Sequence, residues 1–183
     1  MAAPLDRVME RRLHIGGTQA AVGWEVFNIE PAVYVDHVGD AGDLSRFSDQ
    51  TFSMLYASHV LEHFDYLGKV EVTLMEWRRV LIPGGVLCVS VPDLEILASL
   101  LLLKERFDVN DRYLLMRMIY GGHNTPHDFH YAGFTEDLLQ VYLMKSGFQK
   151  IERVPEFGFF KDTSQLLFKE LPISLNIRAV RPE

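Results

Sequence analysis

The sequence lacks a second cysteine and any long apolar run. A single cysteine, Cys88, cannot form a disulfide or a cysteine zinc site within one chain, and its place inside the apolar run VLCVSV predicts a buried core residue. The longest apolar run, from Ile96 to Leu103, falls far short of the roughly 20 residues that span a bilayer. The N-terminal residues carry acids and arginines where a signal peptide has its apolar stretch. We therefore expect a cytoplasmic protein without a membrane partner.

Basic residues are also scarce, with 18 Lys and Arg against 25 Asp and Glu and a formal net charge of -7. This balance disfavours a nucleic acid as the main partner, because such proteins gather Lys and Arg on one face. No Gly/Ser-rich linker or repeat divides the chain, and a composition of 48% hydrophobic and 23% charged residues is that of an ordinary globular protein. We expect one domain over residues 1–183.

Short predicted strands alternate along the chain with segments whose apolar residues recur at helical spacing. Apolar residues recur at helical spacing over 66–82, where Pro83-Gly84-Gly85 then turns the chain. Further helices are predicted over 94–104, over 109–120 and from the cap Thr135 to Lys145. The predicted strands are 12–15, 25–30, 33–40, 52–58, 85–91, 148–157 and 173–180. This alternation predicts an α/β, Rossmann-like, doubly wound and mostly parallel seven-stranded sheet with three α/β/α layers, and an insertion at about 93–134.

Unusual polar and glycine residues follow each of the first five predicted strands. In a doubly wound sheet the ligand lies outside the carboxyl ends of the strands, where the strand order reverses. Each such residue alone is typical of an ordinary turn, but five groups in chain order predict one binding site. The groups are Gly16-Gly17-Thr18, Asn28 with Glu30, Gly39-Asp40, Ser58-His59 and Pro92-Asp93.

Several of these motifs together resemble a known family. The stretches LHIGG, GDAGDL, DQTFSMLYASHVLEHF, EWRRVLIPGG and VSVPDLE are similar to class I S-adenosylmethionine-dependent methyltransferases, of the small bacterial group with the methyltransferase type 11 domain. The resemblance covers about residues 12–93. It implies S-adenosyl-L-methionine as the cofactor and in-line transfer of its methyl group to an acceptor.

The resemblance also implies tasks for single residues. The backbone of Gly16 and Gly17 would approach the methionine moiety, where a side chain would obstruct it. Asn28 or Glu30 would accept the ribose hydroxyls. Asp40 would lie beside the adenine edge, with Ala41 and Leu44 against the base, and Ser58 and His59 would lie near the transferable methyl.

Two positions depart from the family pattern. Thr18 stands where the family usually has a further glycine, and its β-branched side chain is expected to crowd the cofactor. Asn28 replaces the acid at the end of the second strand, and as a neutral partner it should bind a hydroxyl more weakly. We expect a working cofactor loop with reduced or altered affinity.

The segment YGGHNTPHDFHY supplies candidates for contact with the acceptor. His130, held by aromatic neighbours, is our candidate for accepting a proton during transfer, with His59 as a second candidate. Pro126 and the flanking glycines predict a loop, so the spacing of its three histidines loses the meaning it would have on a helix. We predict no metal site and expect His63 to cap or pack against the turn that follows it.

Two other functions stay open. A nicotinamide-dependent Rossmann enzyme is disfavoured because GGTQAA lacks the third glycine of the dinucleotide fingerprint. A methyltransferase-like module that binds or assembles without catalysis stays open because of Thr18 and Asn28. The acceptor is expected to be a small metabolite or a sugar-type molecule, and a homodimer is plausible for so small a catalytic domain.

Overall fold

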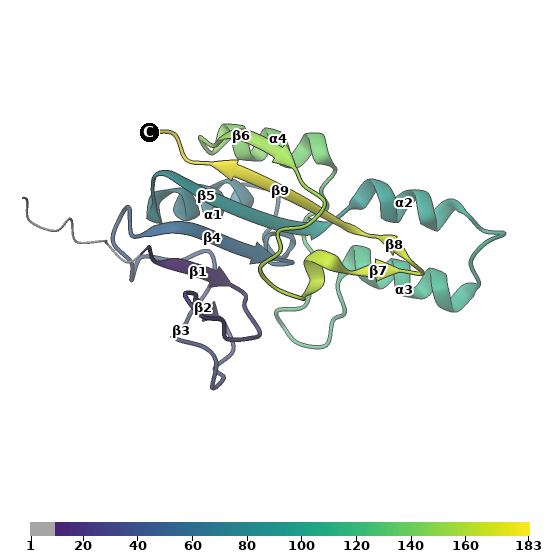
Figure 1. Cartoon of the computed structure of the whole chain (residues 1–183). Helices are drawn as coiled ribbons and strands as arrows, with labels where there is room; N and C mark the ends of the chain where they lie inside the picture. Colours follow the sequence, from purple (N-terminus) through teal and green to yellow (C-terminus); the bar gives the residue numbers. More distant parts are fainter. Residues whose placement is uncertain (1–9) are drawn as a thin grey trace, which may run out of the picture.

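The computed structural model describes residues 10–183, which form one seven-stranded sheet flanked by helices (Figure 1). The strand order is β3-β2-β1-β4-β5-β9-β6, in which β1 to β5 run parallel and β9 runs antiparallel between β5 and β6. The predicted seven-stranded, mostly parallel sheet is therefore confirmed. Its strands are β1 (Arg12–Ile15), β2 (Glu25–Asn28), β3 (His37–Val38), β4 (Phe52–Ser58), β5 (Leu81–Pro92), β6 (Gln149–Arg153) and β9 (Ser174–Val180).

The four α-helices lie close to their predicted positions. They are α1 (Lys69–Val80), α2 (Leu94–Leu102), α3 (Val109–Tyr120) and α4 (Glu136–Lys145). Carboxylates cap two of them: Asp93 accepts a hydrogen bond from the first turn of α2, and Asp108 does so for α3. Thr135 stands at the cap position of α4 as predicted. Its hydroxyl donates to Asp137, however, and does not accept a backbone N–H.

The third strand is shorter than the predicted 33–40. Only His37 and Val38 pair with β2, because the preceding residues turn back on themselves. The N–H of Val35 bonds to the carbonyl of Ala32, and the carboxylate of Asp36 accepts the N–H of Val26 in β2. These local bonds use the groups that a longer strand would have paired.

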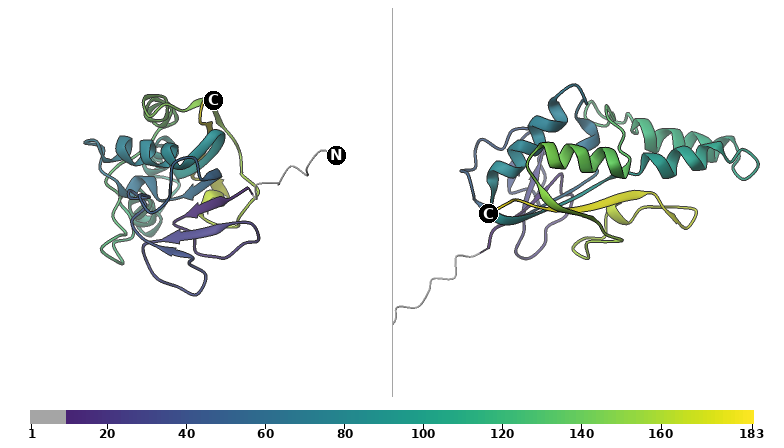
Figure 2. Two further views of the ribbon diagram at one scale, coloured as in Figure 1. Left: turned by 90° about the vertical axis from the view of Figure 1, so that its left-hand side faces the viewer. Right: turned by 90° about the horizontal axis from the view of Figure 1, so that it is seen from above.

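The two faces of the sheet are covered differently, which Figure 2 shows from two sides. Helices α1 and α4 pack on one face, as one of the three predicted layers. On the other face the expected helical layer is built from loops instead. Residues 16–24, between β1 and β2, form turns without a helix, and Trp24 packs there with Phe157 and Phe160 against Tyr56 and Cys88. A connection this short leaves no room for the usual crossover helix.

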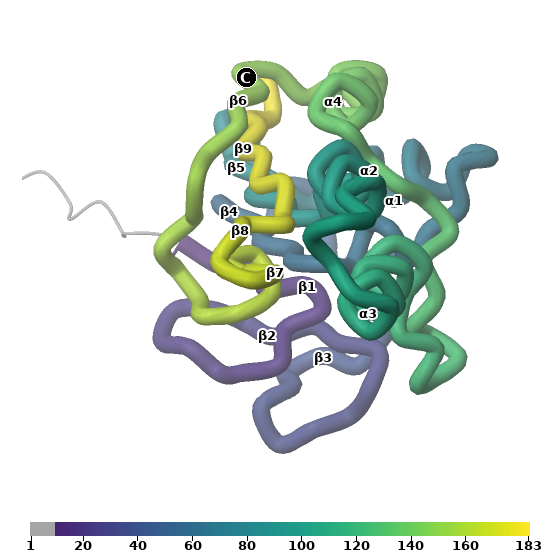
Figure 3. The backbone as a smooth tube through the Cα atoms, turned by 90° about the vertical axis from the view of Figure 1, so that its right-hand side faces the viewer, coloured from purple at the N-terminus to yellow at the C-terminus, as the bar shows by residue number. Residues whose placement is uncertain are grey.

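The predicted insertion forms an arm beyond the carboxyl end of β5 (Figures 1 and 3). Helices α2 and α3 pack on each other around a second core. The small hairpin β7 (Leu167–Phe168) and β8 (Leu171–Pro172) adds Phe168 to this core and was not predicted. Among the described residues, no helix has the length and apolar character needed to cross a membrane.

Candidate functional site

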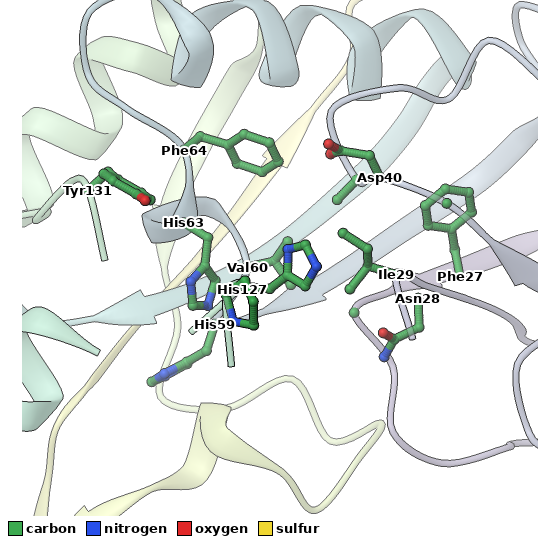
Figure 4. A pocket seen from close by; sticks show the side chains of 14 residues that line it. Phe27, Asn28, Ile29, Asp40, His59, Val60, His63, Phe64, His127 and Tyr131 are labelled. Carbon is green, nitrogen blue, oxygen red and sulfur yellow. The ribbon is translucent and has the colours of Figure 1, made fainter. Parts of the chain in front are cut away.

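Two adjoining cavities open at the carboxyl ends of the parallel strands. The first cavity, drawn in Figure 4, has a volume of about 280 Å³, and the second has about 410 Å³. Three residues, Gly16, His59 and His63, line both. The first cavity is further lined by Phe27, Asn28, Ile29, Gly39, Asp40, Ala41, Val60, Phe64, Pro126, His127 and Tyr131, and the second by His14, Thr18, Ser58, Asp128, His130, Lys161, Asp162 and Thr163.

Most residues predicted from strand ends line one of these cavities. Glu30 is exposed outside both cavities and Gly17 is buried behind them. Leu44 is fully buried in the core under α1, so it does not provide a wall of the first cavity as expected. The predicted residues that line the first cavity are Gly16, Asn28, Gly39, Asp40, Ala41 and His59, and those that line the second are Gly16, Thr18, Ser58, His59 and His130.

Glycine is required at both positions of the turn after β1, because neighbouring side chains leave no room for a Cβ. Gly16 has φ +72°, and a Cβ there would lie 2.4 Å from Cγ2 of Val60. A Cβ on Gly17 would lie 2.8 Å from the ring of His14 and 2.9 Å from Val26. The steric restriction expected at Thr18 therefore falls on Gly16 and Gly17, while Thr18 itself is exposed at the second cavity.

Asn28 fastens the glycine turn to β2. Its Nδ2 donates to the carbonyl of Gly17 at 2.9 Å, and its Oδ1 accepts the N–H of Glu30 at 3.0 Å. A carboxylate at this position has no hydrogen to donate to Gly17. The amide that departs from the family pattern thus has a structural task of its own, which sequence comparison alone did not indicate.

The loop after β3 brings a carboxylate to the far side of the first cavity (Figure 4). Asp40 is exposed there, and its Oδ1 accepts the N–H of Gly42 at 2.8 Å. The carbonyl of Ala41 accepts the indole N–H of Trp77 in α1 at 2.8 Å. The buried helix α1 therefore fixes the position of this loop relative to the sheet.

His59 lies where the two cavities meet. Its backbone has φ +54°, a region that L residues rarely adopt, and its N–H bonds to the carbonyl of Ser90 in β5 at 2.9 Å. Its Nε2 lies 3.0 Å from Oγ of Ser174. Burial lowers the pKa of His59 to about 3. The ring is therefore held neutral at the junction.

The three histidines of the segment YGGHNTPHDFHY, called the histidine loop below, lie in different surroundings. His123 stacks on Phe129 with ring centroids 4.0 Å apart, and His127 lines the first cavity. Only His130 faces inward at the second cavity, where burial lowers its pKa to about 4. Its ring lies edge-on to His63 with centroids 5.0 Å apart. The loop conformation confirms that helical spacing had no meaning here.

Two residues at this site were missed or misplaced from the sequence. Both belong to the short 3-10 helix η1 (Leu61–His63), which follows β4. His63 was expected to pack on the following turn, but it lines both cavities and faces His130. Glu62 is only 1% exposed, and burial raises its pKa to about 8. The motif HVLEHF contained both, but its partner His130 lies too far along the sequence to be paired by spacing.

Comparisons with known proteins identify the fold. Residues 17–89 match the family model described as a methyltransferase domain. No curated protein matches the sequence. A possible exported protein from Bordetella parapertussis aligns with TM-score 0.59 and 13% identity over 96% of this chain and 64% of that one. The chain therefore spans less than two thirds of that structure.

Two further solved structures are methyltransferases. A SAM-dependent methyltransferase from Archaeoglobus fulgidus aligns with TM-score 0.59 and 13% identity over 94% of this chain and 86% of that one. The 1,6-didemethyltoxoflavin-N1-methyltransferase of Burkholderia thailandensis, solved with 1,6-didemethyltoxoflavin and S-adenosylhomocysteine bound, aligns with TM-score 0.57 and 14% identity over 95% and 72% of the two chains. At these identities the likeness shows a shared fold.

Proposed function

We propose that the chain is a class I methyltransferase of the type 11 group that transfers a methyl group from S-adenosylmethionine to a small polar acceptor. The match of residues 17–89 to a methyltransferase domain and the shared fold support this proposal. The observation that carries the proposal is the pair of cavities that meet at Gly16, His59 and His63. A group-transfer enzyme needs two such spaces, because donor and acceptor atoms must be held roughly 3 Å apart and in line.

The first cavity has the features that the nucleoside part of the cofactor requires. Ile29, Ala41 and Phe64 give this cavity an apolar lining. The carboxylate of Asp40 stands at one side (Figure 4). Asn28 lines the same cavity and keeps one amide hydrogen and one lone pair beyond its internal bonds. When bound, S-adenosylmethionine supplies a methyl group on a positively charged sulfur, which would lie toward Gly16 and His59.

The second cavity favours a small acceptor with hydroxyl or amine groups. Its lining residues are almost all of polar or charged types and include Ser58, Asp128, Lys161 and Asp162. A volume of about 410 Å³ suits a small metabolite or a sugar-type molecule. His59 and His130 both reach this cavity, so they are the residues we propose to contact the acceptor.

Calorimetric titration with S-adenosylmethionine, S-adenosylhomocysteine and NAD tests the cofactor assignment. We expect binding of the first two and none of NAD. Asp40→Ala should weaken S-adenosylmethionine binding at least threefold, and Asp43→Ala provides a matched control. Both carboxylates are exposed and cap a local turn, accepting from Gly42 at 2.8 Å and Ser45 at 3.0 Å, but only Asp40 lines the cavity. Equal effects of the two substitutions would show that the base binds elsewhere.

Turnover distinguishes an enzyme from a module that only binds the cofactor. Purified protein with methyl-labelled S-adenosylmethionine and pools of hydroxylated and aminated small molecules should release S-adenosylhomocysteine only in pools that contain the acceptor. Tight binding of the cofactor with no release in any pool, nucleic acids and proteins included, would favour a non-catalytic module.

A further inference from the structure

Glu62 is a buried carboxylate whose side chain makes no hydrogen bond to any residue in 10–183. Both of its oxygens are shielded, and the residue is 1% exposed. A buried charge without a partner is strongly unfavourable, so such groups are paired, neutralised or bound to a metal. Three imidazole rings lie beside the carboxylate of Glu62, from His59, His63 and His130.

The hydrogen bonds of these rings decide which ring nitrogen carries the hydrogen and which keeps a lone pair. Nδ1 of His63 lies 2.9 Å from the carbonyl of Phe129, and Nδ1 of His130 lies 3.3 Å from the carbonyl of Ile119. Because a carbonyl only accepts, each Nδ1 carries the hydrogen and each neutral ring presents Nε2 as a lone pair.

His59 is oriented in the reverse sense. Oγ of Ser174 donates to the carbonyl of Thr163 at 2.7 Å, so it accepts from Nε2 of His59 at 3.0 Å. The lone pair of His59 is then on Nδ1, which lies 3.5 Å from Oε1 of Glu62. Nε2 of His130 lies 3.9 Å from the same oxygen. Lone pairs on nitrogen thus face a carboxylate across gaps too long for a hydrogen bond.

A metal ion accounts for these gaps, because ligand bonds of about 2.0–2.2 Å place neighbouring ligand atoms roughly 3–4 Å apart. The ligand atoms of Glu62, His63 and His130 all lie within 4.8 Å of one another. We propose that Glu62, His63 and His130 bind a divalent transition-metal ion, with His59 outside this set of three ligands. The donor set of imidazoles and one carboxylate favours Zn²⁺, and Mn²⁺, Co²⁺ or Fe²⁺ are compatible with it.

The surrounding structure holds the ligands in place before a metal arrives. The backbone carbonyl of Glu62 accepts the N–H groups of Tyr131 at 2.8 Å and Ala132 at 3.2 Å, which ties the histidine loop to η1. The carbonyls that orient His63 and His130 fix the ring tautomers, as outer partners do in metal sites. The prediction of no metal site considered only the spacing of histidines within the loop, whereas this set combines one of them with the HVLEHF motif.

The site also lies at the wall of both cavities, because His63 lines the two and His130 lines the second. Three protein ligands leave a position for another molecule. That position would attract an oxygen or nitrogen of whatever occupies the second cavity. The metal site itself does not depend on the proposed methyl transfer.

Metal binding is tested with purified chain stripped by a chelator and titrated with Zn²⁺ by calorimetry, and with Co²⁺ by its visible absorption. We expect one ion per chain and a higher melting temperature with Zn²⁺ that a chelator reverses. Glu62→Gln and His130→Ala should each weaken Zn²⁺ binding at least tenfold. His123→Ala is the matched control, because His123 lies in the same loop but stacks on Phe129 away from the cluster. It should bind Zn²⁺ like the parent chain.

Several results would overturn the proposal. They are the absence of stoichiometric binding, an equal loss in His123→Ala, or unchanged binding in Glu62→Gln. Circular dichroism of the stripped variants shows whether each is folded, and His63→Ala replaces any variant that is not. The titrations contain no S-adenosylmethionine, so a failure to bind Zn²⁺ would leave the proposed methyl transfer standing. A chain that binds Zn²⁺ but not the cofactor would support the metal site and contradict the proposed methyl transfer.

Discussion

The helix-covered face of the sheet and the loop-covered face bury similar apolar strands by different means. On the first, Leu74 and Trp77 of α1 and Leu139 and Leu143 of α4 interdigitate with the strands in one large core. On the second, Tyr56 and Cys88 are covered by aromatic residues from irregular segments, chiefly Phe160. The sheet therefore needs cover on both faces, but only one face uses helices to supply it.

Side-chain hydrogen bonds position the loops that cover the second face of the sheet. The hydroxyl of Tyr56 donates to the carboxylate of Asp162 at 2.8 Å, and Nδ2 of Asn176 donates to the carbonyl of Ser164 at 3.0 Å. A helix satisfies its own backbone, whereas a loop needs side chains for this purpose. Because the cover of this face depends on such individual side-chain bonds, we expect the loop-covered face to open more readily than the helix-covered face.

Trp77→Ala gives the largest expected effect in this comparison. Trp77 is fully buried on the helix-covered face, and its loss should cost about 3–5 kcal/mol of unfolding free energy in a urea titration. Trp77→Phe keeps most of the packing but removes the bond to Ala41, so it should cost less. A smaller loss in Trp77→Ala than in a substitution on the loop-covered face would contradict the comparison.

Phe160→Ala tests the loop-covered face and should cost about 2 kcal/mol, less than Trp77→Ala. Phe160 is 6% exposed and packs on His14 with ring centroids 4.1 Å apart, but the loop that carries it can relax into the space. Its neighbour Phe159 is 38% exposed, and Phe159→Ala should cost below about 1 kcal/mol by the same urea titration. Equal losses for Phe160 and Trp77 would mean that the loop is as rigid as the helices.

Asn28→Asp tests the connection between β1 and β2, which is the first of the loops that cover this face of the sheet. The substitution removes the donor to the carbonyl of Gly17 and should lower stability by about 1–2 kcal/mol. It should also fail to tighten S-adenosylmethionine binding, although it restores the acid of the family pattern. Asn28→Ala separates the lost donor from charge repulsion in thermal unfolding. Tighter cofactor binding with unchanged stability would show that Asn28 serves the ribose and not the turn.

Thr18→Gly should have the smallest effect. Thr18 is exposed, so calorimetry should show a change in S-adenosylmethionine affinity below about 0.5 kcal/mol. Gly17→Ala, one residue earlier, should destabilise the protein, because its Cβ would lie 2.8 Å from the ring of His14. A clear gain of affinity in Thr18→Gly would restore the hypothesis that its β-branched side chain crowds the cofactor.

The regular strands and helices could be predicted from local patterns. Strand β4 and helix α3 have the predicted bounds, because alternation and helical spacing are written into neighbouring residues. The clusters at strand ends were also predictable, since parallel strands end at the same edge of the sheet. The loop cover was not, because Phe160 meets His14 and Asp162 meets Tyr56 only through the fold.

The candidate site follows the same division. Asp40 and His59 were predicted because they follow strand ends, and both line the first cavity. The pairing of Glu62 and His63 with His130 depends on how a long loop returns to η1, which no sequence spacing encodes. Leu44 was placed against the adenine base through the resemblance to the family, whereas here the residue is buried in the core.

The labelling rate of the single thiol of the chain reports how often the loops that cover the second face of the sheet move away from it. Cys88 is 2% exposed beneath Phe160, and burial raises its pKa to about 12, so the closed protein does not react with alkylating reagents. Labelling then proceeds only during excursions that uncover β5, and its rate divided by that of a free thiol gives the fraction of time spent uncovered. With one cysteine in the sequence, mass spectrometry can follow this rate without introducing any mutation.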